Sequence, residues 1–186
     1  MASTYPTSLD AFTNPLAADL MTSPSHAQQH SDINDAVEAL EAKVAIGNTV
    51  LGTYTAFTPT LGQITIGNGT IEAKYCRVNN FVHYYGKITF GSTTSITGAN
   101  ANFTLPLTAD VPATNVSTPV GICSSYDTSI GTWYFGTPSL ANSTTVYGGI
   151  TQVGGSYPQW TGWTASVPMT WATGDFFSFN IFYKAA

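Results

Sequence analysis

The sequence predicts a mainly β protein in which a short α-helical stalk precedes a larger antiparallel β-domain. Of the 186 residues, 8% are charged and 13% are aromatic, so hydroxyl and amide groups supply much of the polarity. From Thr49 onward, short runs of β-branched and aromatic residues alternate with Gly- and Asn-containing turns, which is typical of many short strands. An Ala-rich, charged segment from His26 to Ile46 comes before them and is typical of a helix.

We expect three parts: an extended leader (1–24), a coiled-coil helix (25–47) and a β-domain (48–186). Three prolines interrupt the leader, which has apolar residues but no core of its own. Such a segment becomes ordered only by lying on another surface, although a frayed terminus is the common alternative. We expect docking, through Leu9, Phe12, Leu16, Leu20 and Met21.

Capping residues mark both ends of the predicted helix. Thr22 or Ser23 can cap its first turn, where Pro24 is tolerated because its missing N–H would have no partner there. Ser31 and the residues after it offer a second start. Gly47 follows the last apolar residue, as a helix terminator does.

Within the helix, apolar residues recur at spacings of four, three and four, in the a/d pattern of a coiled coil. We expect this stripe to drive self-association, because a closed β-sandwich has no spare face for a helix. Packing against the β-domain of the same chain is the alternative. The stripe is compatible with two or three strands. The expected trimerisation residues are Ile33, Val37, Leu40 and Val44.

Extending the heptads backwards places His26 and His30 on the same stripe. In an oligomer they would form a ring suited to a metal or an anion. Such histidines are more often hydrated residues of the seam or part of a docking surface, so we expect no metal site.

The number and spacing of these strands predict that the β-domain is an antiparallel β-sandwich that resembles a jelly roll. Asn79 and Asn80 give the best hairpin signal, because both flanking strands alternate. The last strand is apolar on both faces, so we expect it in mid-sheet or against a neighbouring subunit. The predicted strands are 50–57, 63–66, 71–78, 81–90, 102–105, 116–124, 132–135, 144–150 and 176–183.

Charge argues against several classes of partner. Six of the ten acidic residues fall before residue 47, whereas four acidic residues balance four basic ones in the β-domain. No basic stripe is present to neutralise phosphates, so we expect neither nucleic acid nor a membrane surface as partner. The N-terminus does not resemble a signal peptide, and Cys76 and Cys123 are expected to be small buried residues.

Catalytic motifs are scarce, so we expect no enzyme and no cofactor. The four carboxylates of the β-domain form no close pair in sequence, and its one histidine, His83, fits a hydrogen-bonded strand residue. Aromatic residues in or near Gly- and Pro-rich segments are better candidates, since exposed rings stack on sugars or contact proteins. Loop packing and subunit contact are equally good explanations for them. They are Trp133, Tyr134, Tyr157, Trp160 and Trp163.

Two segments resemble virion proteins of tailed bacteriophages. The leader from Tyr5 to Asp10 with Asn14-Pro15, and the helix from His26 to Val44, are similar to an N-terminal attachment module of those proteins. The β-domain resembles fibre heads in its segment 73–90, in Phe103 to Pro106, and in Gly174-Asp175 before the last strand. This resemblance implies a homotrimer, made in the host cytoplasm, whose N-termini are fixed to the virion surface.

Two functions follow as expectations. The first is a head fibre or capsid decoration protein whose leader binds capsid or tail proteins. The second is a tail-fibre adhesin that recognises glycan on the host surface. The leader favours attachment without indicating the surface, and the scarcity of carboxylates argues against a third reading, a depolymerase.

Overall fold

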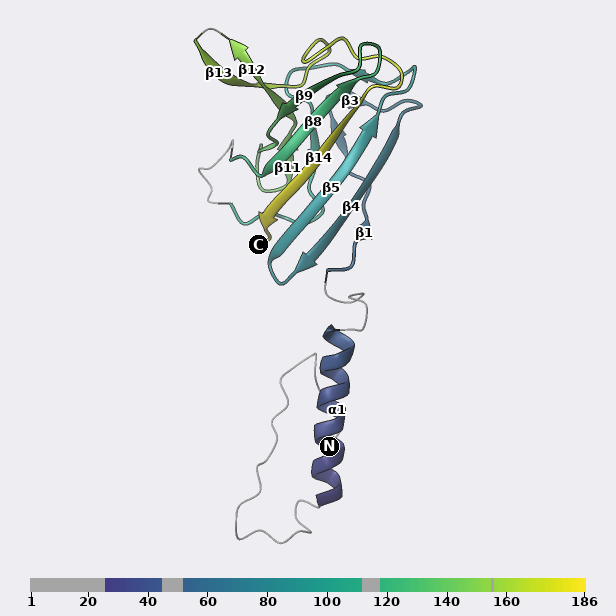
Figure 1. The fold of residues 1–186 in the computed structure, drawn as a ribbon, viewed down its shortest axis with the longest axis vertical. Helices are drawn as coiled ribbons and strands as arrows, with labels where there is room; N and C mark the ends of the chain where they lie inside the picture. The colour runs from purple at the N-terminus through teal and green to yellow at the C-terminus, as the bar shows by residue number, and fades with distance from the viewer. Residues whose placement is uncertain (1–25, 45–51, 112–117, 155) are drawn as a thin grey trace. The chain divides into compact units, whose positions relative to one another are not determined.

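The computed structural model describes residues 26–44, 52–111, 118–154 and 156–186. Contacts divide the chain into two compact units, 1–53 and 54–186. The described residues contain one helix and fourteen strands, so the protein is mainly β, as the sequence predicts (Figure 1).

The helix of the first unit, α1, spans His26–Val44. It contains no Gly or Pro and includes four Ala, two Glu and two Gln, which favour the helical state. Gln28 supports it by donating a hydrogen bond of 2.7 Å to Asp32, one turn later. The alternative helix start predicted at Ser31 was wrong, because the helix already includes His26. The predicted N-terminal cap and C-terminal terminator lie outside the described residues.

The second unit contains a six-stranded antiparallel sheet. Its long hairpin pairs two nine-residue strands around Asn79, whose φ of 55° suits the turn. The last strand lies between the second strand of this hairpin and another neighbour, in mid-sheet as predicted. The order is β1 (Thr55–Ala56), β4 (Thr70–Val78), β5 (Phe81–Thr89), β14 (Phe176–Lys184), β8 (Gly121–Asp127) and β9 (Thr132–Gly136).

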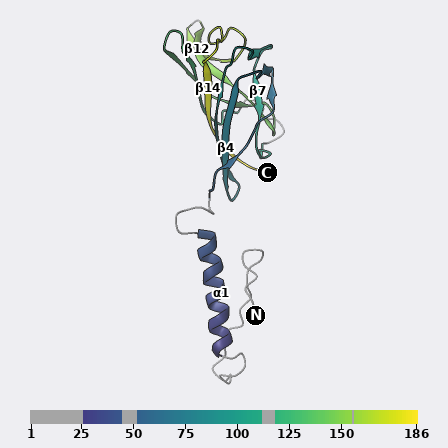
Figure 2. The ribbon, with the colours of Figure 1, turned by 90° about the vertical axis from the view of Figure 1, so that its right-hand side faces the viewer.

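Shorter strands form a four-stranded sheet and two ribbons. The four-stranded sheet has the order β10 (Ser139–Leu140), β11 (Thr145–Tyr147), β7 (Asn102–Thr104) and β2 (Leu61–Gly62). One ribbon pairs β12 (Gly149–Gly154) with β13 (Tyr157–Gly162), and the other pairs β3 (Ile64–Thr65) with β6 (Ser95–Ile96). Seen edge-on, β14 and β7 lie on opposite sides of this unit (Figure 2).

A single aromatic core joins the two larger sheets. Phe103 of β7 stacks on Phe179 of β14 with ring centroids 4.4 Å apart, and Tyr84 of β5 lies 4.9 Å from the same ring. Trp163, just after β13, packs on Phe177 at 4.1 Å. Burying rings of this size contributes about 1.5–3 kcal/mol each before entropy is subtracted, so this core is the main stabilising element of the unit.

Several predicted strands were confirmed, and others were wrong in extent. The segments 71–78, 81–90, 102–105, 132–135 and 176–183 match strands to within two residues. The segment 144–150 divides into β11 and the start of β12, and 50–57 reduces to β1 within its described part. The strand predicted at 116–124 begins only at Gly121 within the described residues, and β2, β6, β10 and β13 were missed.

Candidate binding face on the six-stranded sheet

The six-stranded sheet has one face on the core and one exposed face. Along β14, the buried side chains alternate with partly or fully exposed ones, because successive strand residues point to opposite sides. Strand register brings the exposed residues of five strands into rows. We call this set the outer face; it comprises Glu72, Lys74, Cys76, Val78, Phe81, His83, Tyr85, Lys87, Ile122, Ser124, Tyr126, Trp133, Phe135, Phe176, Ser178, Asn180 and Phe182.

Aromatic rings gather at the β8–β9 end of the outer face. Tyr126 and Trp133 are register partners whose centroids are 4.7 Å apart, and Phe176 lies 5.4 Å from Tyr126. Trp133 and Phe135 have nearly parallel rings, 6.2 Å apart, and they are 47% and 67% exposed. These two rings therefore present apolar surface to solvent, which is the property that a stacking ligand requires.

A second aromatic group surrounds His83. Its Nδ1 is 2.6 Å from the Tyr54 hydroxyl and its Nε2 is 2.6 Å from Oδ1 of Asn180. The ring stacks on Phe182 at 4.5 Å, with an interplanar angle of 7°. Desolvation, with a smaller contribution from Cys76, raises the pKa of Tyr54. His83 is therefore a strand histidine with a hydrogen-bond partner at each ring nitrogen, as predicted, and it holds the side chain of Asn180 in place.

A hollow of about 890 Å³ lies between these two groups. Tyr85, Ile122 and Phe135 supply apolar lining, and two hydroxyls, Ser124 and Ser178, contribute polar groups 2.8 Å from each other. The volume is within the range of about 300–1,000 Å³ found for ligand pockets. Glu72, Lys74 and Lys87 also line the hollow, so its wall carries charged groups on the side of β4 and β5.

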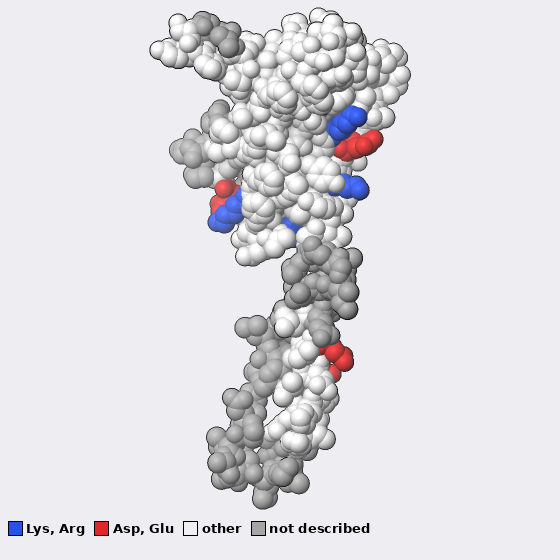
Figure 3. Space-filling model, viewed as in Figure 1, with Lys and Arg blue, Asp and Glu red and all other residues white. Residues whose placement is uncertain are grey.

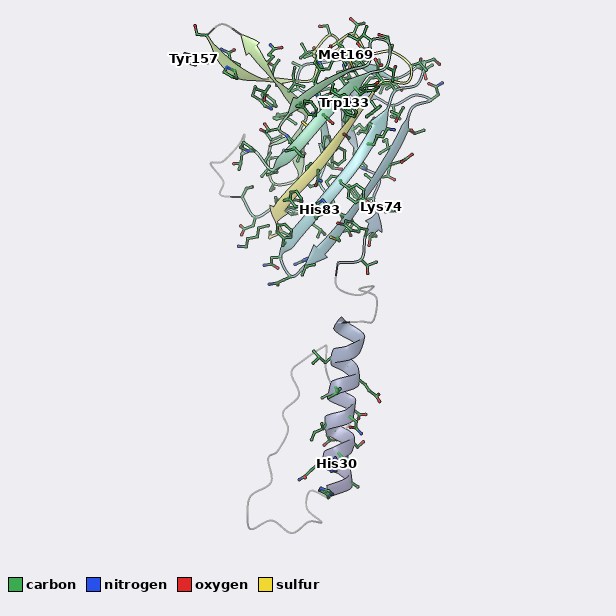
Figure 4. The ribbon with its side chains drawn as sticks, in the orientation of Figure 1. His30, Lys74, His83, Trp133, Tyr157 and Met169 are labelled. Carbon is green, nitrogen blue, oxygen red and sulfur yellow. The ribbon has the colours of Figure 1, made fainter. Side chains whose placement is uncertain are left out.

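Charge is sparse on this face and lies toward β4 and β5. Glu72 and Lys87 are register partners, and Lys74 pairs with Tyr85 in the same two strands. Lys87 also places its Nζ 4.4 Å from the ring centroid of Phe176. The space-filling view shows wide areas of this side of the unit without Lys, Arg, Asp or Glu (Figure 3). Figure 4 labels Lys74 of β4, His83 of β5 and Trp133 of β9.

The five aromatic residues predicted to bind a ligand do not form one site. Trp133 belongs to the outer face, whereas Tyr134 points to the other side of β9 and packs against the core. Tyr157 on β13 is 77% exposed, and Trp160 donates a hydrogen bond of 2.8 Å to the carbonyl of Thr137. The prediction of Trp163 as a ligand-binding surface residue was wrong, because its side chain is fully buried and packs in the core.

Most of the exposed apolar residues of the outer face were not predicted from the sequence. These residues come from five strands that fall into three separate parts of the sequence, so no local pattern links them all. The available signal was the alternation in each strand, which places aromatic residues on both faces. The missed exposed residues are Val78, Phe81, Tyr85, Ile122, Phe135 and Phe182.

The predicted assembly and attachment residues are only partly described. Ile33, Val37 and Leu40 lie on α1 and are 55%, 46% and 51% exposed. Val44 is the last residue of the helix. The attachment residues of the leader lie outside the described residues.

Two of the four carboxylates in the second unit, Asp127 and Asp175, accept hydrogen bonds from neighbouring loop residues. Asp175 is fully buried and accepts hydrogen bonds from the backbone N–H and hydroxyl of Thr128 and from the N–H of Ala172. The hydroxyl of Ser129 lowers the pKa of Asp127, to which it donates. Among the described residues, no group of three or more His, Cys, Asp or Glu side chains is placed to hold a metal ion.

Both cysteines are free thiols. Cys123 is buried as predicted, with Sγ 2.9 Å from the carbonyl of Gly149, whereas Cys76 is half-buried on the outer face. Burial raises the pKa of Cys123 to about 11, so this thiol is protonated at neutral pH.

No helix in the described part of the chain has the length and apolar character needed to cross a membrane.

The comparisons with known proteins give no match. No family model matches the chain, and neither the curated proteins nor the solved structures give a match.

Proposed function

We propose that the protein is a structural protein of a bacteriophage virion, a homotrimeric head fibre or decoration protein. Its N-terminal segment anchors it to capsid or tail proteins, α1 forms a coiled-coil stalk, and the second unit is a β-sandwich displayed on the virion surface. The observation that carries this proposal is the exposed apolar stripe of α1. The resemblance of the leader and helix to phage attachment modules supports the same assignment.

The stripe needs a partner for physical reasons. A helix of 19 residues is marginally stable alone in water, and burial of one face is what usually stabilises it. Ile33, Val37 and Leu40 are each about half exposed, so apolar area remains available on all three. Covering it contributes up to about half of the 1.5–3 kcal/mol that full burial of such a side chain gives, and copies of the same stripe are complementary to it.

The contact between the two larger sheets supports the sandwich. Buried aromatic rings from β7 and β14 meet between them, which is how sheets pack face to face. The low charge of this unit also suits close packing of copies around a shared stalk, because the copies do not repel one another.

The mass of the full-length protein in solution tests the assembly. We expect three times the chain mass by light scattering, and a monomer at micromolar concentration would refute the stalk. Leu40→Asp, on the stripe, is expected to dissociate the trimer. Ala39→Asp adds the same charge outside the a/d positions and is expected to leave it intact.

The location needs an independent experiment. Electron microscopy of phage particles labelled with an antibody against residues 54–186 should show label at regular positions on the virion. Removal of residues 1–24 should abolish incorporation into particles, while the free protein should still be three times the mass of the shortened chain. Unlabelled particles would reject the virion assignment even if the trimer forms.

A second candidate function, adhesion to host-surface glycan, is favoured by the hollow of the outer face. Exposed rings beside hydroxyl and amide groups match the needs of a pyranose, which offers an apolar ring face and several hydroxyls. Phe135 and Tyr85 line the hollow and remain exposed, so they are the residues to test.

An adsorption assay separates the two functions. If the protein is an adhesin, Phe135→Ala and Tyr85→Ala should reduce adsorption of phage to host cells, whereas Tyr157→Ala, an exposed aromatic outside the face, should not. If the face instead contacts other subunits, Phe135→Ala should weaken the trimer measured by light scattering. Unchanged adsorption and unchanged mass would leave the outer face without either role.

A further inference from the structure

Two histidines lie one turn apart on α1. His26 and His30 are separated by four residues, and both side chains are exposed. Their rings are perpendicular, with centroids 4.5 Å apart, and their Nε2 atoms are 3.2 Å apart. The same nitrogen of each imidazole is thus directed toward its neighbour.

This separation matches that of two imidazoles bound to one metal ion. Zn–N bonds of about 2.0–2.1 Å with angles between octahedral and tetrahedral values place two ligand nitrogens about 2.8–3.4 Å apart. A hydrogen bond between one protonated and one unprotonated Nε2 has the same length. In the metal-bound form, the ion would lie off the line between the two nitrogens, each Nε2 would direct its lone pair at the ion, and each ring would carry its proton on Nδ1.

The surroundings leave both imidazoles available. The third histidine of the chain, His83, already has a partner at each ring nitrogen. On the described helix, the residues three or four positions from the pair are uncharged, namely Ala27, Gln29, Ile33 and Asn34. No carboxylate at these spacings holds a proton on the pair or competes for it.

We propose that His26 and His30 chelate a divalent transition-metal ion of the kind that imidazole prefers, such as Zn²⁺ or Ni²⁺. Two ligands from one helix leave coordination positions for water. The heptad pattern assigns His26 to position d and His30 to position a, the stripe that also contains Ile33. In the proposed trimer, three such pairs supply up to six imidazoles, so the metal would bind more tightly and would link the three helices.

Calorimetric titration of the full-length protein with ZnCl₂ at a pH of about 7.5 tests this site. We expect saturable binding by the unmodified chain. His26→Ala and His30→Ala should each weaken binding by at least about 10–100-fold, the loss that even outer-shell changes cause at metal sites. Gln29→Ala, between the two histidines, is the matched control and should bind as the unmodified chain does.

A second readout follows the helix itself. Zn²⁺ binds only the arrangement in which the two rings are one turn apart, so it should raise the temperature at which the helical circular dichroism is lost. This increase should disappear in the His26→Ala, His30→Ala double variant.

The outcomes separate the metal site from the trimer. Equal Zn²⁺ binding by the unmodified chain and the double variant would overturn the proposal, as would an absence of binding by the unmodified chain. A monomer that binds one ion per chain would support the site and reject the trimer. A trimer that binds no ion would reject the site alone.

Discussion

Trp163 lies so close to Gly148 that a Cβ atom on the glycine would come within 1.9 Å of the indole ring. The backbone N–H of Trp163 also donates a hydrogen bond of 3.0 Å to the Gly148 carbonyl. The indole is fully buried and packs on Phe177, so it has no room to move away. A glycine at position 148 is therefore a packing requirement of the core.

Trp163→Ala should lower the free energy of unfolding by about 3–5 kcal/mol, because the substitution leaves a large cavity in the core. Tyr157→Ala is the control: its ring is 77% exposed, and its loss should change stability by no more than about 0.5 kcal/mol. Urea denaturation followed by circular dichroism measures both. Similar midpoints for the two variants would contradict the buried position of Trp163.

Gly148→Ala should be destabilising by about 1–3 kcal/mol through overpacking against the indole. The same methyl group should cost less in the Trp163→Ala background, where the ring is absent. A double-mutant cycle from four urea curves measures this coupling. Additive effects of the two substitutions would show that the glycine and the indole do not contact each other.

The best-predicted parts of the fold have strong local signals. The β4–β5 hairpin joins two alternating strands through Asn79, a residue that tolerates positive φ. The central place of β14 followed from its unusually apolar sequence. Two-residue strands such as β2 and β6 were missed because periodicity cannot be recognised over two residues.

The candidate site was harder to predict because it depends on long-range register. Phe135 and Phe182 belong to strands about 50 residues apart, and only the pairing of β14 with β8, and of β8 with β9, brings them to one face. Trp163 was misread for the opposite reason. Its neighbours resemble an exposed loop, whereas its ring is fully buried and packs on Phe177.

Phe179→Asp and Phe182→Asp should differ sharply although both change β14. Phe179 is 3% exposed and stacks on Phe103, so a carboxylate there would be buried without a partner and should prevent folding. Phe182 is 43% exposed on the outer face, where a carboxylate stays hydrated. Soluble yield and near-ultraviolet circular dichroism distinguish them. A folded Phe179→Asp variant would contradict the placement of β14.

The protein should lose stability as pH rises from about 9 to about 12. Burial raises the pKa of Cys123 to about 11 and that of Tyr183 to about 12, and it also raises the pKa of Tyr84. Unfolded cysteine and tyrosine release their protons near pH 8.5 and 10, respectively. The folded state therefore holds more protons over this range, and the free energy of unfolding decreases with pH.

Tyr84→Phe separates this effect from ordinary alkaline denaturation. The Tyr84 hydroxyl is buried with no hydrogen-bond partner among the described residues, so its removal should not destabilise the protein at neutral pH and should reduce the loss above pH 10. Tyr183→Phe is the matched comparison. Its hydroxyl donates to the carbonyl of Leu107 and accepts from the N–H of the same residue, so its removal should cost stability at neutral pH as well. Urea midpoints measured at several pH values test both variants, and equal alkaline losses in Tyr84→Phe and the unmodified chain would show that Tyr84 does not contribute.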